Sequence, residues 1–136
     1  MIKVYFDGAA WLWKKAGYGY VIKDGDTWIM QDYGVVPCEP KKSTSNVAEH
    51  YALYKALEWL EKNGYANKEI LVNGDSKMVI SQMFRGWRCR DVNLPYYPFF
   101  VMNLGIQAKF SNLKGKLLPR EMNEQADELS KLGLRS

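Results

Sequence analysis

The order in which strand-like and helix-like hydrophobic patterns follow one another constrains the fold of this chain more than any other feature of its sequence. Three segments with the two-residue alternation of β-strands come first, and helical and strand-like patterns then alternate up to residue 132. Successive strands followed by a β-α-β-α series predict an α/β fold with a mixed sheet. The 136 residues show no repeat and no linker, so we expect a single domain over residues 1–136.

Turn and helix-stop signals divide the chain into elements. Asp7-Gly8 ends the first expected strand, Asp24-Gly25-Asp26 forms the turn of a hairpin, and Asn63-Gly64 ends the longest helix. The expected strands are residues 2–7, two arms within 16–36, 69–73 and 115–119. The expected helices are 47–62, 74–84, 95–110 and 123–132, with Gly133 after the last one and an irregular basic segment at 85–93.

Composition excludes several classes of protein. Hydrophobic residues make up 47% and charged residues 25% of the chain, which excludes a disordered chain and a coiled coil. Cys38 and Cys89 are too few for a disulfide framework, and no apolar run approaches the ~20 residues of a membrane span. No signal peptide is visible, so we expect a cytoplasmic protein with no membrane partner. The net charge of +4 permits a polyanionic partner without requiring one.

Four acidic residues stand at notable positions in these elements. Asp7 ends the first strand, Glu49 lies in the first turn of the long helix, Asp75 follows the fourth strand, and Asp127 lies in the last helix. Each also has an ordinary structural explanation. Asp7 could belong to a turn, Asn46 and Glu49 could form a capping box, Asp75 could cap the second helix, and Asp127 could be solvated.

The expected positions of these acids favour a shared site. On a helical wheel Glu49 lies within the apolar stripe of its helix, where an unpartnered carboxylate would cost desolvation energy. Asp75 emerges at the C-terminal end of a strand, the edge at which open α/β sheets bind ligands, and Asp7 lies beside it if the two strands are parallel neighbours. Clustered carboxylates repel one another, and Mg²⁺ relieves that repulsion. Two such ions about 4 Å apart can activate a water and stabilise the leaving oxygen of a phosphodiester.

Five segments carry a resemblance to a known family: YFDGA (5–9), AGYGYVI (16–22), TSNVAEHYAL (44–53), NGDSKMVI (73–80) and LPREMNEQADELS (118–130). Their order and spacing resemble those of type 1 ribonuclease H over nearly the whole chain. The closest likeness is to compact forms that carry a PRExNxxAD segment. The resemblance implies a ribonuclease H-like α/β fold, in which helices flank a five-stranded mixed sheet of order 3-2-1-4-5.

The resemblance also implies an activity and its catalytic groups. It implies an endonuclease that cleaves the RNA strand of RNA–DNA hybrids and leaves 3′-hydroxyl and 5′-phosphate ends. Asp7, Glu49, Asp75 and Asp127 match the four catalytic acids, which would hold two Mg²⁺ ions, with Mn²⁺ left open as a substitute. Asp7 would bridge the ions, Asp127 would help to hold the ion that activates water, and Glu49 and Asp75 would hold the ion on the leaving-group side.

Substrate contacts follow from the same resemblance. They would come from Gly8, Ser76 and the polar residues Thr44, Ser45 and Asn46, of which Ser45 replaces an Asn of the family pattern. Because only RNA carries a 2′-hydroxyl, contacts to the ribose would distinguish it from DNA. The helix-cap role of Asn46 is compatible with such a contact.

The chain departs from the family pattern in the loop expected at residues 9–15. The sequence AAWLWKK stands there, where many members have Gly and Asn. Trp11 and Trp13 could stack on nucleic acid, but we expect them to pack on the sheet or to mediate self-association. Lys14 and Lys15 could contact phosphates or could simply be solvated.

Two further departures concern a histidine and a basic protrusion. The loop 119–123 has no His, and Arg120 or Glu121 could replace it, whereas His50 is expected to leave the core stripe in a structural or surface role. The protrusion is reduced to residues 85–90. Its Arg85, Trp87, Arg88 and Arg90 could contact the DNA backbone, or form a solvated loop around a buried Trp.

Two other functions remain open at this stage. The chain could be a non-catalytic module that binds hybrids or duplex RNA, or another nuclease of the ribonuclease H-like superfamily. All four acids argue against the first, and the segments TSNVAEH and NEQADELS favour ribonuclease H over the second. The expected partner is an RNA–DNA hybrid, with duplex RNA left open, and a monomer is expected with a dimer left open.

Overall fold

A computed structural model describes residues 1–136, whose five strands form one mixed sheet of order β3-β2-β1-β4-β5. The strands are β1 (Ile2–Trp11), β2 (Lys15–Asp24), β3 (Thr27–Val35), β4 (Glu69–Gly74) and β5 (Asn112–Leu117). β1 pairs antiparallel with β2 and parallel with β4, and β5 runs parallel to β4. The α/β class, the strand order and the parallel pairing of the first and fourth strands are confirmed.

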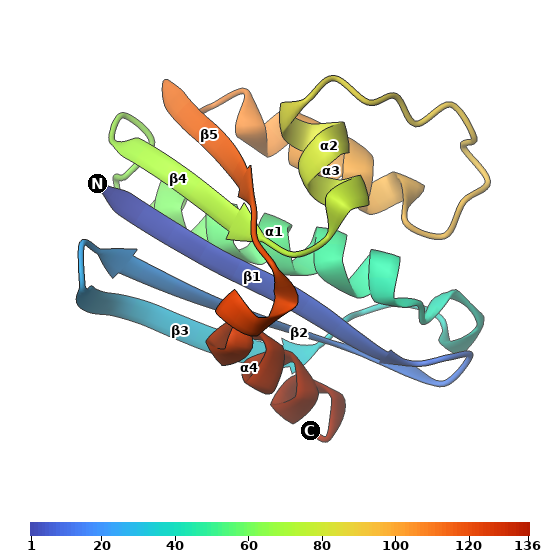
Figure 1. Cartoon of the computed structure of the whole chain (residues 1–136). Coiled ribbons are helices and arrows are strands. Elements are labelled where there is room, and N and C mark those ends of the chain that lie inside the picture. The colour runs from blue at the N-terminus through green and yellow to red at the C-terminus, as the bar shows by residue number, and fades with distance from the viewer.

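Helices cover the two faces of the sheet unequally. Helix α1 (Ser45–Lys62) crosses behind the sheet in the view of Figure 1, and α4 (Glu124–Leu134) lies in front of it. Helices α2 (Lys77–Phe84) and α3 (Tyr97–Gln107) lie beyond the β5 edge, with α2 in front of α3. Two 3₁₀ turns, η1 (Pro40–Lys42) and η2 (Arg120–Met122), precede α1 and α4. None of these helices is both long and apolar enough to cross a membrane.

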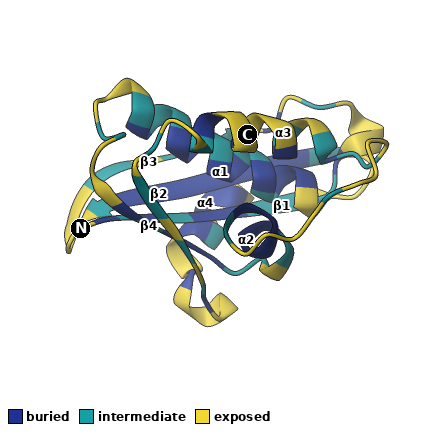
Figure 2. Cartoon of the chain, turned by 90° about the horizontal axis from the view of Figure 1, so that it is seen from above, coloured by how far each residue is buried: buried dark blue, intermediate teal, exposed yellow.

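The main core lies between the sheet and α1. Alternate residues of β1 (Ile2, Val4 and Phe6) are buried there, together with the apolar stripe of α1 around Leu53 and Leu57. Figure 2 shows the buried residues gathered in the strands and on the helix sides that face them. This packing fixes the direction of α1 across the sheet, and α1 carries Glu49.

Several element boundaries differ from those predicted. β1 does not end at Asp7-Gly8, because β2 pairs with it along its whole length up to Trp11 and Lys15. Residues 9–15 are therefore the end of a β-hairpin and not a loop. α1 begins two residues earlier than predicted, at Ser45, and β5 begins three residues earlier, at Asn112.

The last helix continues through Gly133, which was expected to lie beyond it. A Cβ atom on Gly133 would lie 2.4 Å from the carbonyl oxygen of Gly34 and 2.9 Å from that of Tyr18. Gly133 therefore allows α4 to approach the backbone of β2 and β3, and it does not terminate the helix.

This close approach makes opposite predictions for two helical glycines. Gly105 in α3 has nothing within 4 Å of a built Cβ, so Gly105→Ala is expected to raise the free energy of unfolding by about 0.5–1 kcal/mol through helix propensity. Gly133→Ala is expected to lower it by roughly 1–3 kcal/mol, because overpacking outweighs propensity. Urea denaturation of both variants measures the difference. Equal stabilisation by the two substitutions would contradict the packing of α4.

Candidate active site

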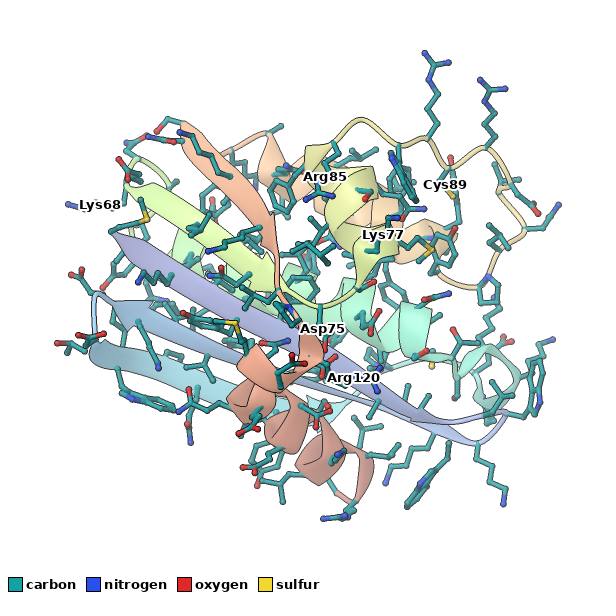
Figure 3. All side chains as sticks on the ribbon, in the orientation of Figure 1. Lys68, Asp75, Lys77, Arg85, Cys89 and Arg120 are labelled. Carbon is teal, nitrogen blue, oxygen red and sulfur yellow. The ribbon has the colours of Figure 1, made fainter.

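Three carboxylates from separate elements converge at the centre of the molecule. The parallel register pairs Tyr5 with Asn73, so Asp7 on β1 lies beside Asp75, which follows β4. Glu49 reaches them from α1. One carboxylate oxygen of each residue lies within 4.8 Å of the others. Figure 3 shows Asp75 at this point, between the sheet and the start of α4.

The backbone of Gly8 determines how closely Glu49 approaches. A Cβ atom on Gly8 would lie 2.4 Å from the backbone nitrogen of Glu49 and 2.5 Å from the carbonyl carbon of Ala48. A side chain at this position would therefore push α1 away from β1. The Gly8 N–H also donates to Oδ1 of Asp7 at 2.9 Å, which orients that carboxylate.

Asp127 lies at the edge of the cluster. Its side chain is half-buried and forms an ion pair with Lys131, one turn further along α4, with 3.0 Å between Oδ2 of Asp127 and Nζ of Lys131. It also contacts Asp7 closely enough to help raise the pKa of that carboxyl. The structure thus brings three of the four predicted acids into one group and places the fourth beside it.

The ordinary explanations for three of these acids are wrong. Asp7 lies inside β1 and not in a turn. The N-cap of α1 is Thr44, whose hydroxyl accepts from the Val47 N–H, so Asn46 does not cap the helix and Glu49 lies beyond its first turn. The N-cap of α2 is Ser76 and not Asp75. None of these three carboxylates is used for helix capping.

Burial and mutual repulsion perturb the cluster. Burial, followed by the charge of Asp75, raises the pKa of Asp7 to about 8. Burial raises the pKa of Glu49 to about 7, although a hydrogen bond from Ser76 acts to lower that pKa. Burial also raises the pKa of Asp75, although the guanidinium of Arg120 opposes this shift. The protein holds these acids together at an electrostatic cost.

The chemistry of the cluster fits a hard cation. Oδ2 of Asp75 is buried and has no hydrogen-bond partner, and the nearest cationic group is Nε of Arg120, 3.8 Å away, on a side chain 87% exposed (Figure 3). Buried polar atoms are normally satisfied, and carboxylate oxygens are the ligands that Mg²⁺ prefers. A divalent ion would supply the missing partner of this oxygen.

The predicted substrate residues surround the cluster without all being exposed. Ser45 and Asn46 are exposed at the start of α1, and Thr44 and Ser76 are half-buried because they cap helices. The remaining one, Gly8, lies under the first turns of α1. The N-terminal end of α1 therefore presents exposed polar side chains next to Glu49.

The basic segment 85–90 is irregular, as predicted. Arg85, Arg88 and Arg90 are exposed, and Trp87 is 49% exposed, so the alternative of a loop around a buried Trp is wrong. The ammonium of Lys77 lies 5.9 Å from the centre of the Trp87 ring. Figure 3 shows Lys77 and Arg85 on α2 and at its end, on the side of the cluster opposite α4.

The hairpin tip also differs from expectation. Trp11 and Trp13 are 50% and 62% exposed, so they do not pack on the sheet, and only stacking or self-association remains open for them. Lys14 is exposed, whereas the Lys15 ammonium donates to the carbonyl oxygen of Ser136. Lys15 thereby ties the hairpin to the C-terminus of the chain.

His50 is fully buried, so the prediction that it leaves the core stripe is wrong. Its Nε2 donates to Oε1 of Gln82 at 2.9 Å, and its Nδ1 lies 3.3 Å from Nδ2 of Asn103. Burial lowers the pKa of His50 to about 4, so the ring is neutral at pH 7. This network ties α1 to α2 and α3, which is a structural role.

Asn123 is a positioning residue whose role the sequence patterns did not predict. Its Nδ2 donates to the carbonyl oxygen of Phe6 at 2.9 Å, next to Asp7 in the chain. This bond holds the start of α4, and therefore Asp127, against β1. The signal that could have found it is the spacing of four residues between Asn123 and Asp127.

Comparison with known proteins agrees with this geometry. A family model described as reverse transcriptase-like matches residues 7–133. LC11-RNase H1, solved in complex with an RNA/DNA hybrid, is 30% identical, with a TM-score of 0.84 over 99% of this chain and 97% of that one. The chain belongs to the type 1 ribonuclease H family. Its compact form, without the loop His and with a reduced basic segment, is therefore a variant of that family's domain.

Two other similar proteins differ in how much of their length this chain matches. RNase H1 from Halobacterium salinarum is 28% identical with a TM-score of 0.83, over 98% of this chain and 97% of that one. A bifunctional protein of Mycobacterium tuberculosis is 30% identical over 119 residues, which are 85% of this chain but 30% of that protein. The chain thus spans about a third of the length of its mycobacterial relatives.

The raised pKa of Asp7 predicts the pH dependence of stability. A carboxyl with a folded-state pKa of about 8, against an ordinary value of 3.8, favours folding at acidic pH and loses that contribution as the pH rises through 8. In EDTA at pH 8, the free energy of unfolding of Asp7→Asn is therefore expected to be higher than that of the wild type. The difference should be on the order of a few kcal/mol, because the variant does not bury a charged carboxylate. The advantage should disappear near pH 4. Chemical denaturation at both pH values measures it, and a pH-independent difference would contradict the account.

Proposed function

We propose that this chain is a metal-dependent endonuclease that hydrolyses the RNA strand of RNA–DNA hybrids, with residues 1–136 as a single ribonuclease H domain. The observation that carries the proposal is the convergence of Asp7, Glu49 and Asp75, whose carboxylate oxygens lie within 4.8 Å of one another. A pure binding module has no use for clustered negative charge that faces phosphates. The complex of LC11-RNase H1 with a hybrid supports the choice of substrate.

Asp7, Glu49, Asp75 and Asp127 are the residues that would hold two divalent ions, for which we propose Mg²⁺, with Mn²⁺ as an alternative. Such ions would supply an activated water and would stabilise the leaving oxygen of a phosphodiester. The products that we propose carry 3′-hydroxyl and 5′-phosphate ends. The protein orients the ligands. The Gly8 N–H holds one oxygen of Asp7, Ser76 holds Glu49, and Asn123 fixes the helix that carries Asp127.

Substrate recognition is proposed to come from two sides of the cluster. Thr44, Ser45 and Asn46 at the start of α1 would contact ribose 2′-hydroxyls, which only the RNA strand carries. Asn46 is exposed and is not needed as a helix cap, so its amide is available for such a contact. Gly8 and Ser76 would border the same RNA strand.

The DNA strand would be bound by cationic side chains. Arg85, Arg88 and Arg90 are exposed around Trp87, a combination that suits contact with a phosphate backbone. Lys14 at the hairpin tip is a further phosphate contact in this proposal, and Lys15 would act less directly because it binds the C-terminal residue.

Arg120 is proposed to take the place of the histidine that other members carry before the last helix. It lies at the mouth of the cluster, 3.8 Å from Asp75, on a side chain that is 87% exposed. Such a side chain can move between the carboxylates and a substrate phosphate. Glu121, on the same turn, lacks the positive charge that this role requires.

Further parts of the proposal concern partners and location. The partner is an RNA–DNA hybrid, with duplex RNA as a substrate to be tested, and the protein acts as a monomer in the cytoplasm. Cys38 and Cys89 are free thiols, which fits a reducing compartment.

Substitution at the cluster tests the proposal. Asp75→Asn is expected to reduce cleavage of a labelled hybrid in Mg²⁺ by about 100-fold or more. The substitution removes one charged ligand of a metal ion, and such an ion stabilises the charge of the transition state by several kcal/mol. Asp26→Asn, in the exposed β2–β3 turn, is the matched control and should leave cleavage unchanged. A gel assay with a hybrid labelled on the RNA strand measures both. Full activity of Asp75→Asn would contradict the proposed two-metal site. Binding of the hybrid without cleavage by the wild type would instead favour a non-catalytic binding module.

A further inference from the structure

The face of the sheet that carries α4 is only partly covered. Helix α4 has 11 residues and is about 16 Å long, whereas the ten residues of β1 extend for about 33 Å. α4 contacts β1, β2 and β3. Figure 1 shows it in front of the lower part of the sheet, with β4, β5 and the beginning of β1 bare on the viewer's side.

The strand register places lysines from three strands on this same face of the sheet. Lys23 on β2 pairs with Lys3 on β1, Lys3 pairs with Leu71 on β4, and Leu71 pairs with Lys114 on β5. Paired residues share a face of the sheet, and so does Lys116, two positions after Lys114.

Packing on the other face confirms the direction of these side chains. Gly115, which lies between Lys114 and Lys116, faces the ring of Phe84 on α2, and a Cβ atom there would come within 2.2 Å of it. Lys114 and Lys116 therefore point away from α2, and both are exposed.

Two aromatic rings lie among these lysines. The Lys23 ammonium is 4.8 Å from the centre of the Trp28 ring and 5.5 Å from that of Tyr5, and Trp28 is 46% exposed. A hollow of about 300 Å³ adjoins them, lined by Tyr5, Lys23 and residues 121–125. Glu121 and Glu124 are the acids on that margin, so the cationic character is strongest toward β5.

We propose that this lysine face, formed by Lys3, Tyr5, Lys23, Trp28, Lys114 and Lys116, binds single-stranded nucleic acid. Bases would stack on the two rings, and the phosphates between them would meet the lysines, the combination that open sheets use to hold single strands. The row from Lys23 to Lys114 crosses three strand intervals, or about 14 Å, which suits a site of about four nucleotides. This goes beyond hybrid cleavage, because the face uses none of the four acids.

The arrangement of the rings favours a single strand over other polyanions. In a duplex the base faces are stacked inside, so Trp28 and Tyr5 would have no partner. A lipid surface attracts any lysine cluster, but its headgroups offer no flat aromatic partner that would stack on the two rings. Here the Lys23 ammonium lies over both rings, and a phosphate can draw it away and uncover them for a base.

Fluorescence anisotropy with a labelled 12-nucleotide single-stranded RNA, in EDTA so that no cleavage occurs, tests the proposal. Lys114→Glu/Lys116→Glu is compared with Lys62→Glu/Lys68→Glu, which makes the same change in net charge at exposed sites next to the far end of α1. The first variant is expected to bind about tenfold more weakly than the control. Its slope of log K against log salt should fall by roughly 1.4, or 0.7 for each lost phosphate contact.

Trp28→Ala supplies a second variant that keeps every charge. It is expected to weaken binding about tenfold through the loss of one stacked base, with circular dichroism confirming the fold of each variant. Equal affinities of the β5 variant and its control, or no binding by the wild type, would overturn the proposal. So would binding to vesicles containing phosphatidylserine in preference to the RNA. Because the assay needs neither metal nor cleavage, its failure is distinct from failure of the proposed nuclease activity.

Discussion

The repulsion between the buried carboxylates of Asp7, Glu49 and Asp75 is the constraint on which the rest of this structure depends. Parallel pairing of β1 and β4 brings two of these groups together, and the absence of a side chain at Gly8 lets α1 bring the third. The fold tolerates this cost because a large core between the sheet and α1 fixes the positions of all three elements. A functional site that opposes local stability in this way is common in enzymes.

The surrounding polar groups keep the cluster free for a ligand. Thr44 and Ser76 satisfy the starts of α1 and α2, so no acid of the cluster is occupied as a helix cap. His50, buried and neutral, ties α1 to its neighbouring helices and thereby steadies the residue before it in the chain. The three carboxylates are thus held by groups that do not neutralise them, and the cationic group that pairs with Asp75 is the exposed guanidinium of Arg120.

Sequence patterns predicted the parts of this protein that depend on local or pairwise rules. Strand alternation and helix periodicity predicted the five strands and the helices and placed the four acids along them, and the resemblance to type 1 ribonuclease H implied the sheet order and the roles of those acids. The length of β1 and the continuation of α4 through Gly133 were missed, because both follow from contacts with distant strands. The burial of His50 and the exposure of Trp11 were missed for a similar reason. Periodicity places a residue on a helix or strand, but neighbouring elements decide whether that face is covered.

Proton release on metal binding tests the central claim most directly. Without metal, the raised pKa values of Asp7 and Glu49 leave at least one proton in the cluster at pH 7, and a divalent cation must displace it. Titration calorimetry with Mg²⁺ in two buffers of different ionisation enthalpy measures that proton. Release of about one proton is expected for each protein molecule that binds metal, since carboxylates bind metal in their ionised form. Heats that are identical in the two buffers would show that the carboxylates are already ionised, and would contradict the account.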